Sequence, residues 1–161
     1  IQALGMYWQR DLVIWRVNPK IYGKQQANSE PIDFCEQRGV YILYDHHTVV
    51  YAGRSVDRPL GQRLFEHTKD RIGGRWNRFS WFGLWRVNDD GGLVEPKVNP
   101  SFQALINSFE ALLIEALEPP LNRKRREHFN STEYIQDIDP ELKEQDIQAM
   151  LRSFEQALRG N

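Results

Sequence analysis

Two apolar stretches, residues 39–45 and 48–54, flank a polar pair of histidines in the sequence GVYILYDHHTVVYAGR. Short runs rich in valine, isoleucine and tyrosine on either side of a polar turn are typical of a β-hairpin. Apolar residues occupy both faces of both runs, so we expect central strands that are covered on each side. Pairing of Tyr41 with Tyr51 across the hairpin would require a three-residue loop at 45–47.

The rest of the pattern predicts further strands and helices around this hairpin. β-branched and aromatic residues predict strands at 11–17 and 78–87, and apolar residues at helical spacing predict helices at 60–72, 102–117 and 143–158. Gly73 follows the first helix, and the pair Pro119-Pro120 ends the second. We therefore expect helices that cover a sheet.

The helix at 102–117 carries two glutamates that differ in their surroundings. At 100° per residue, Glu110 lies at the edge of the apolar face beside Ile106 and Leu117, whereas Glu115 points toward solvent. A carboxylate half-covered by apolar neighbours needs a cation or hydrogen-bond donors to compensate its charge. Glu110 is therefore a candidate metal ligand, although extension into water or pairing with an arginine would satisfy it equally well.

Composition limits the chain to one domain of ordinary globular character. It has 161 residues, a mass of 19.0 kDa and a net charge of −1. The charge is uneven, because eight cations face three acids between Arg54 and Arg86, whereas eight acids face three cations from Glu127 onward. Such patches are either solvated faces or sites for a polyanion.

Cysteine usage and hydropathy indicate a cytoplasmic protein with no membrane span. Cys35 is the single cysteine, which excludes an internal disulfide and favours a reducing compartment and an inert thiol. No run approaches eighteen apolar residues, and no signal peptide is visible at the start. We read His46 and His47 as exposed turn residues. Because the chain begins at Ile1, we expect it to be part of something longer.

A set of motifs between Gly39 and Asn122 resembles the GIY-YIG nuclease superfamily. The two hallmark tripeptides correspond to Gly39-Val40-Tyr41 and Tyr51-Ala52-Gly53. The pattern continues with a basic residue, Arg54, and with an arginine one helical turn before a histidine, Arg63 and His67. It ends with a helix glutamate followed by a proline and an asparagine, which here are Glu110, Pro119 and Asn122. Glu115 could also take the place of the glutamate, but the spacing favours Glu110. The match covers about half of the chain.

The resemblance implies an α+β fold with three parts. A small core at 39–122 would hold a three-stranded antiparallel sheet flanked by helices. Residues 1–38 would form an N-terminal strand and loop extension. Residues 123–161 would supply a basic run and an acidic helical tail packed on or near the core.

The resemblance also implies a metal-dependent endonuclease that hydrolyses DNA phosphodiester bonds with one magnesium or manganese ion held by Glu110. Single carboxylates suit such hard cations, and an arginine fork suits a phosphate, as expected for Arg63. Tyr41 would take a proton from the attacking water, or His67 would do so in its place, because imidazole is the easier base. The remaining implied roles are a hydroxyl contact to water or phosphate from Tyr51, a lowered phenol pKa from Arg54, close approach at Gly53, and substrate contacts from Asn122, Arg123 and Arg125.

Two alternatives stay open at this point. The chain could be a noncatalytic DNA-binding or protein-interaction module that keeps the nuclease fold. The acidic tail could cover the basic face and inhibit it, which would predict salt-dependent activation on truncation at Glu127. Restriction, repair, mobile-element and defence or toxin roles are all compatible with the sequence, as is any oligomeric state.

Overall fold

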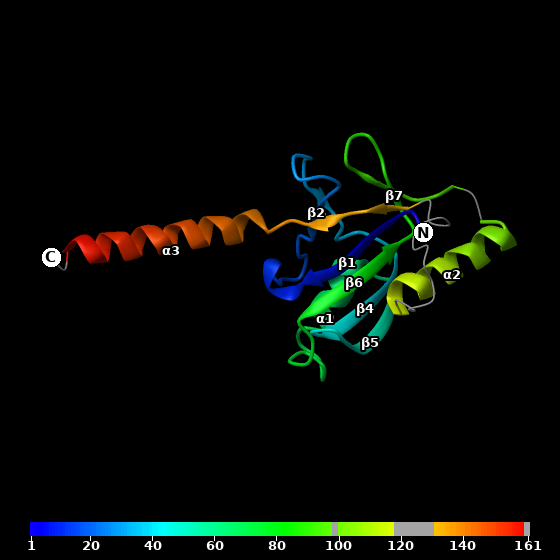
Figure 1. The fold of residues 1–161 in the computed structure, drawn as a ribbon, viewed down its shortest axis with the longest axis horizontal. Helices are drawn as coiled ribbons and strands as arrows, with labels where there is room; N and C mark the ends of the chain where they lie inside the picture. The colour runs from blue at the N-terminus through cyan, green and yellow to red at the C-terminus, as the bar shows by residue number, and fades with distance from the viewer. Residues whose placement is uncertain (98–99, 118–130, 160–161) are drawn as a thin grey trace.

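The fold is mixed α/β and is built around one five-stranded sheet (Figure 1). A computed structural model describes residues 1–97, 100–117 and 131–159. The elements in chain order are β1 (Ala3–Gln9), the short 3-10 helix η1 (Arg10–Leu12), β2 (Tyr22–Lys24), β3 (Ile32–Asp33), β4 (Gly39–Asp45), β5 (Thr48–Ser55), α1 (Leu60–Glu66), β6 (Arg78–Gly83), β7 (Arg86–Val87), β8 (Leu93–Val94), α2 (Phe102–Leu117), β9 (Thr132–Glu133), β10 (Ile135–Gln136) and α3 (Pro140–Arg159).

The main sheet is larger than the three-stranded antiparallel sheet that the family resemblance implies. Its order is β5-β4-β6-β1-β9, and all neighbours are antiparallel except β9, which runs parallel to β1. Within it, β5, β4 and β6 are consecutive antiparallel neighbours. Two small sheets, β10-β2-β3 and β7-β8, complete the β structure of the described residues.

The predicted hairpin is confirmed as β4 and β5, but its register is different. Tyr41 lies opposite Gly53 and Leu43 opposite Tyr51, and a bulge follows Leu43, so the turn is the two-residue pair at 46–47. β5 is also an edge strand rather than a central one, with Val49 51% exposed. The sequence could not show this, because exposed valines and buried valines give the same pattern.

The strand expected at 11–17 is wrong. The strand lies earlier, at β1, and residues 11–17 form part of η1 and a loop whose Val13 side chain is buried. Trp15 from the same loop packs against the core. Apolar residues buried from a loop produce the same enrichment as a strand, which explains the error.

The core lies between one face of the main sheet and α1. Tyr41, Leu43, Phe79 and Trp81 from β4 and β6 meet Leu60 and Leu64 from α1, and all six side chains are at most 1% exposed. These sheet residues share a face because Tyr41 lies opposite Trp81 and Leu43 opposite Phe79. The predicted helix at 60–72 is confirmed in its first half and ends at Glu66.

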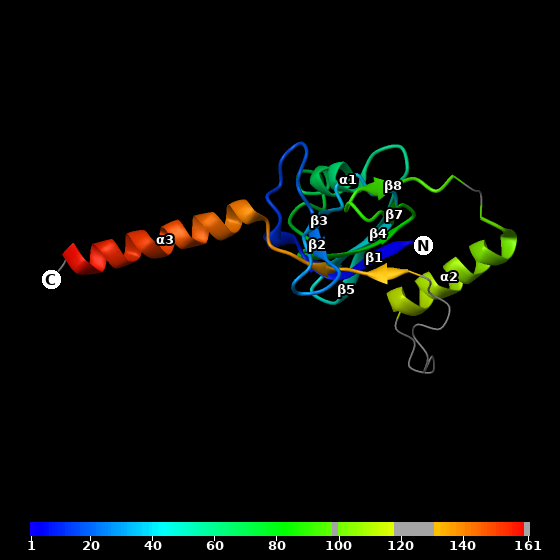
Figure 2. The same ribbon diagram turned by 90° about the horizontal axis from the view of Figure 1, so that it is seen from above.

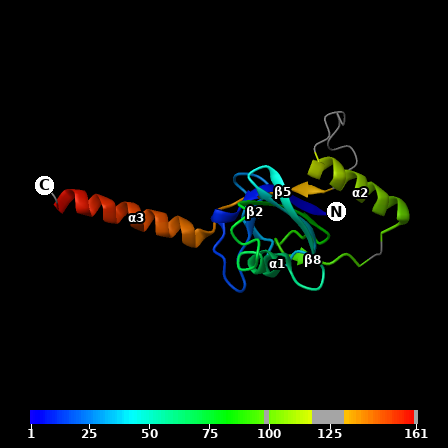
Figure 3. The same ribbon diagram turned by 90° about the horizontal axis from the view of Figure 1, so that it is seen from below.

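α2 lies on the opposite side of the sheet from α1, as Figures 2 and 3 show from two sides. Val40 and Phe82, which lie out of phase with Tyr41 and Trp81, border a largely apolar cleft together with Leu105, Phe109 and Leu112 of α2. The predicted helix bounds of 102–117 are confirmed. Of the α2 side chains, only Ala111 is buried.

α3 extends away from the sheet instead of packing on it (Figure 1). Every described side chain from Lys143 to Leu158 is exposed. This differs from the expectation that the acidic tail packs on or near the core. None of the described helices is both long and apolar enough to span a bilayer.

Candidate functional site

Tyr41 lies at the centre of the candidate site, on the β4 face that contacts α1. Its side chain is 0% exposed. Gly53 lies opposite on β5, and a Cβ atom there would stand only 2.4 Å from the Tyr41 Cζ and hydroxyl atoms. Glycine is therefore required at position 53 because the Tyr41 ring crosses its backbone closely.

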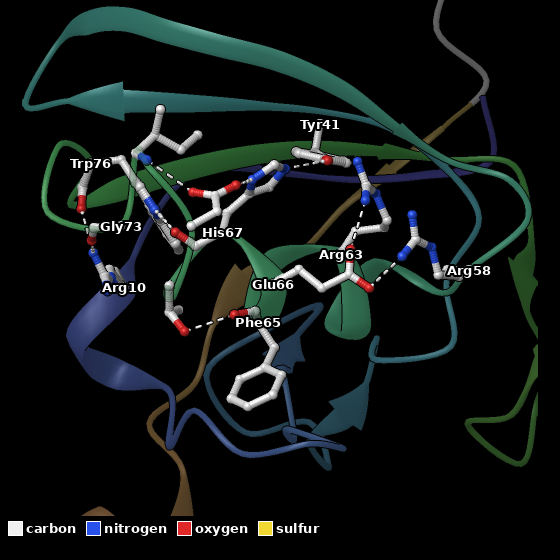
Figure 4. Close-up of polar contacts among 12 residues, drawn as sticks. Arg10, Tyr41, Arg58, Arg63, Phe65, Glu66, His67, Gly73 and Trp76 are labelled. Carbon is white, nitrogen blue, oxygen red and sulfur yellow. Dashed lines mark hydrogen bonds and ion pairs between the residues drawn. The ribbon is translucent and has the colours of Figure 1, made fainter.

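His67, directly after α1, joins Tyr41 to Asp70. The Tyr41 hydroxyl and His67 Nε2 are 2.8 Å apart, and His67 Nδ1 lies 2.7 Å from Asp70 Oδ2. The His67 carbonyl accepts a hydrogen bond of 3.0 Å from the Trp76 indole (Figure 4). The backbone and both ring nitrogens of His67 are thus held in place.

The charge on Asp70 sets the direction of this hydrogen-bond chain. Partial desolvation acts to raise the pKa of the Asp70 carboxyl. Hydrogen bonds from the Ile72 N–H and His67 outweigh this effect and hold that pKa below its ordinary value. An ionised Asp70 accepts a hydrogen bond from Nδ1–H of His67, and with this tautomer the ring accepts a hydrogen bond from the Tyr41 hydroxyl at Nε2. Tyr41 is therefore the donor.

Tyr51 is the accessible member of this aromatic group. Its ring centroid lies 6.3 Å from that of Tyr41 and 4.6 Å from that of His67. Unlike Tyr41 and His67, which are buried, Tyr51 is partly exposed on the edge strand β5. A ligand that approaches the site meets Tyr51 first.

The pKa of Tyr41 is shifted in the direction that disfavours a phenolate. Burial is the main cause and raises the pKa of Tyr41 to about 12, although the Arg63 guanidinium acts in the opposite direction. The sequence-based mechanism requires a lowered pKa for this phenol. In the arrangement described, Tyr41 is a neutral hydrogen-bond donor at neutral pH.

An arginine-lined pocket opens beside the aromatic group. Its volume is about 190 Å³, and its walls are Arg54, Val56, Asp57, Arg58 and Arg63. Glu66 Oε2 lies 2.6 Å from Arg63 Nη1, and Glu66 Oε1 lies 2.7 Å from Arg58 Nη1 (Figure 4). Guanidinium groups collected around a small pocket favour phosphate as a ligand.

Arg54 borders this pocket from the edge of the sheet. It lies opposite Val40, so its backbone position belongs to the face that α2 covers and not to the Tyr41 face. Its side chain contributes to the walls of both the arginine-lined pocket and the apolar cleft at α2. This position suits a contact to an anion better than a direct effect on the phenol of Tyr41.

Glu110 is not brought to this site. It lies on α2, which is on the other side of the sheet from α1, whereas Tyr41 belongs to the core between the sheet and α1. The helical pattern predicted a half-covered Glu110 and a solvent-facing Glu115. The structure shows the reverse, because Glu110 is exposed and Glu115 is partly buried. The site residues in this arrangement therefore do not fit a divalent ion held by Glu110.

Three residues of the site were not identified from the sequence. Arg58 lines the pocket, Glu66 joins Arg58 to Arg63, and Asp70 holds His67. The signal for two of them is present, because Glu66 follows Arg63 by three residues and Asp70 follows His67 by three, a spacing at which helical side chains meet. Asn122, Arg123 and Arg125, expected to contact substrate, lie outside the described residues, as does Pro119.

The other reactive side chains considered from the sequence are Cys35, which is buried, and His46 and His47, which lie in the hairpin turn. Burial raises the pKa of the Cys35 thiol to about 12, which disfavours a thiolate. His46 and His47 are exposed in the hairpin turn, and His46 Nδ1 lies 2.7 Å from Asp45 Oδ1. In the described parts of the chain, no three His, Cys, Asp or Glu residues form a group that could hold a metal ion.

Comparisons with known proteins do not add to this picture. The sequence matches no protein-family model, and neither a curated protein nor a solved structure is significantly similar to the chain.

Proposed function

We propose that the protein is a DNA endonuclease that hydrolyses phosphodiester bonds at the site formed by Tyr41, Tyr51, His67 and Arg63. The observation that carries the proposal is the 2.8 Å contact between Tyr41 and His67 beside a pocket lined by three arginines. A phosphodiester is anionic, and its hydrolysis requires cations fixed around the phosphate and a group that accepts a proton from water. Both elements lie within this one region of the fold.

The arginines would bind the phosphate, and the hydrogen-bond chain would move the proton. Arg63 presents a permanently charged fork to the phosphate oxygens, with Arg54 and Arg58 on the other walls. Tyr41 transfers its proton to His67 Nε2 as it takes one from water, and Asp70 stabilises the imidazolium that forms. The hydroxide bonds to phosphorus, the ester bond to the leaving oxygen breaks, and that oxygen takes a proton from solvent. The water enters beside Tyr51, because that ring is the accessible one.

The resemblance to GIY-YIG nucleases adds a divalent ion, magnesium or manganese, which would stabilise charge on the phosphate. Because Glu110 lies across the sheet, none of the steps above passes through the ion. Its requirement is a separate question for experiment.

Nicking of supercoiled plasmid DNA tests the proposal. We expect the protein to produce nicked or linear DNA with magnesium or manganese, and Arg63→Ala to lose this activity by roughly a hundredfold or more, since it removes the phosphate fork. Arg75→Ala is the matched control, because Arg75 is an exposed arginine outside the pocket. Equal cleavage by the Arg63→Ala variant and the parent would contradict the proposal.

A noncatalytic DNA-binding module is the second candidate, and the placement of Glu110 favours it. Such a module would bind DNA through the arginines and give no product with either metal on single-stranded, duplex and branched substrates. Glu110→Ala and Glu115→Ala, measured side by side, identify the glutamate that matters if cleavage occurs. Loss of cleavage in Glu110→Ala alone would mean that α2 takes another position when DNA is bound.

A further inference from the structure

We infer that Glu66 is a positioning residue that holds Arg63 in its phosphate-binding orientation by joining it to Arg58. The inference rests on the proposed function, because it concerns the same arginine-lined pocket. It adds a carboxylate that lies outside the pocket walls, while both of its arginine partners line them.

The geometry of the bridge supports this role. Each carboxylate oxygen of Glu66 contacts a different arginine, Oε2 at 2.6 Å from Arg63 and Oε1 at 2.7 Å from Arg58 (Figure 4). Arg63 and Glu66 lie three residues apart on α1, whereas Arg58 precedes the helix. Glu66 thus ties the segment between β5 and α1 to the helix itself, and it links two of the guanidinium groups that line the pocket.

The exposed fractions of the Arg63, Glu66 and Arg58 side chains differ, and they indicate which arginine Glu66 orders. The Arg63 side chain is 20% exposed and that of Glu66 30%, whereas that of Arg58 is 50% exposed. A long side chain in contact with water loses rotamer freedom when it binds a phosphate, unless a partner has already ordered it. Glu66 orders Arg63 before the ligand arrives.

The charge of Glu66 acts against binding, which gives the inference a specific signature. Glu66 places a negative charge in contact with two of the three arginines that would attract DNA. Removing this charge strengthens the positive field and so the attraction of a polyanion. The same change releases Arg63 from its fixed orientation, and a small displacement of a catalytic group is costly to the rate.

The test measures DNA affinity and cleavage rate separately for Glu66→Gln. We expect DNA affinity at low salt to rise, on the order of threefold, with a steeper dependence on salt. We expect kcat for plasmid nicking to fall by about tenfold or more. Glu36→Gln is the matched control, because Glu36 is an exposed glutamate beside Arg38, away from the pocket, and should change neither quantity. Thermal unfolding of each variant shows whether the fold is intact.

Glu66→Asp separates orientation from charge. The shorter side chain keeps the charge but cannot reach both arginines, so we expect affinity near that of the parent and a reduced kcat. If Glu66→Gln leaves both affinity and kcat unchanged, or lowers both together, the positioning role is wrong. A failure of the proposed function can be told apart from a failure of this inference, because the parent protein would then give no cleavage product. In that case the DNA affinity of Glu66→Gln would still show whether Glu66 opposes anion binding.

Discussion

At the scale of single residues, the hydrogen-bond chain from Tyr41 through His67 to Asp70 makes a testable contribution to stability. The pKa of Asp70 is lower in the folded protein than its ordinary value, so the folded state favours the carboxylate. This contribution is complete above the pKa of Asp70 in the unfolded chain, about 3.9, and is lost as the pH falls through the lower folded value. The Asp70 side chain is 41% exposed, which limits the effect to about 1 kcal/mol or less.

We therefore expect Asp70→Asn to lower the free energy of unfolding between pH 5 and 7, and to have a progressively smaller effect below about pH 4. Urea unfolding of both proteins across this range measures the difference. Asp45→Asn is a suitable control, since the carboxylate of that exposed aspartate lies 2.7 Å from the exposed His46 in the hairpin turn. A difference that grows as the pH falls would contradict the assignment of the low pKa to Asp70.

Gly53 is the second residue whose role can be measured directly. A Cβ atom at this position would overlap the buried Tyr41 ring at 2.4 Å, whereas at Gly74 it would meet nothing within 4 Å. We expect Gly53→Ala to destabilise the protein by roughly 1–3 kcal/mol, as overpacking does. Gly74→Ala should have an effect within about 0.5 kcal/mol. Equal effects of the two substitutions in urea unfolding would show that Tyr41 does not cross Gly53.

At the scale of elements, α1 and α2 make unequal contributions to the core. Leu64 of α1 is 0% exposed, whereas Leu113 of α2 is 53% exposed. We expect Leu64→Ala to cost about 2–5 kcal/mol, as buried leucines do. Leu113→Ala, which makes the same change in helix propensity, should cost less than about 1 kcal/mol. A large effect of Leu113→Ala would show that α2 is covered in solution, by a second copy or by another part of the protein.

The elements also show which features the sequence could predict. The hairpin and the bounds of 102–117 were predicted because their periodicity is strong and glycine, proline and polar turn residues delimit them. The strand at 11–17 was wrong because these residues form a loop that buries Val13 and packs Trp15 against the core while Val17 stays exposed, and β1, which contains Gly5 and Met6, has fewer β-branched and aromatic residues. The hairpin register depends on a bulge after Leu43, and no residue type in the sequence predicts this bulge.

The candidate site was predictable in part for the same reason. The meeting of Tyr41, His67 and Arg63 depends on a hairpin and the helix that follows it, which are near in sequence and strongly patterned. The position of Glu110 depends on the face of the sheet against which α2 packs. An amphipathic helix can cover either face, so its periodicity does not contain this information.

At the scale of the whole molecule, the position of α3 distinguishes between two explanations of the acidic tail. In the inhibitory explanation the tail covers the basic pocket, and in the extended explanation it projects into solvent. If the tail covered the basic pocket, its removal would expose the arginines and strengthen DNA binding. In the structure α3 begins at Pro140 and extends away from the sheet, and its side chains from Lys143 to Leu158 are exposed, so it covers neither face. The ion pairs that tie the start of the helix to the body involve Glu141 with Arg16 and Lys143 with Asp137.

Deletion of residues 144–161 keeps these two ion pairs and removes the exposed part of α3. We expect the urea midpoint of unfolding to be unchanged, because no buried apolar contact is lost, and the hydrodynamic radius to decrease. DNA affinity should rise only slightly at low salt, since the removed acids lie far from the pocket, and should be unchanged at about 0.15 M salt, where the Debye length is about 8 Å. Strong activation of DNA binding that persists at this salt concentration would mean that the tail folds over the arginines in solution, and the inhibitory explanation would then replace the extended one.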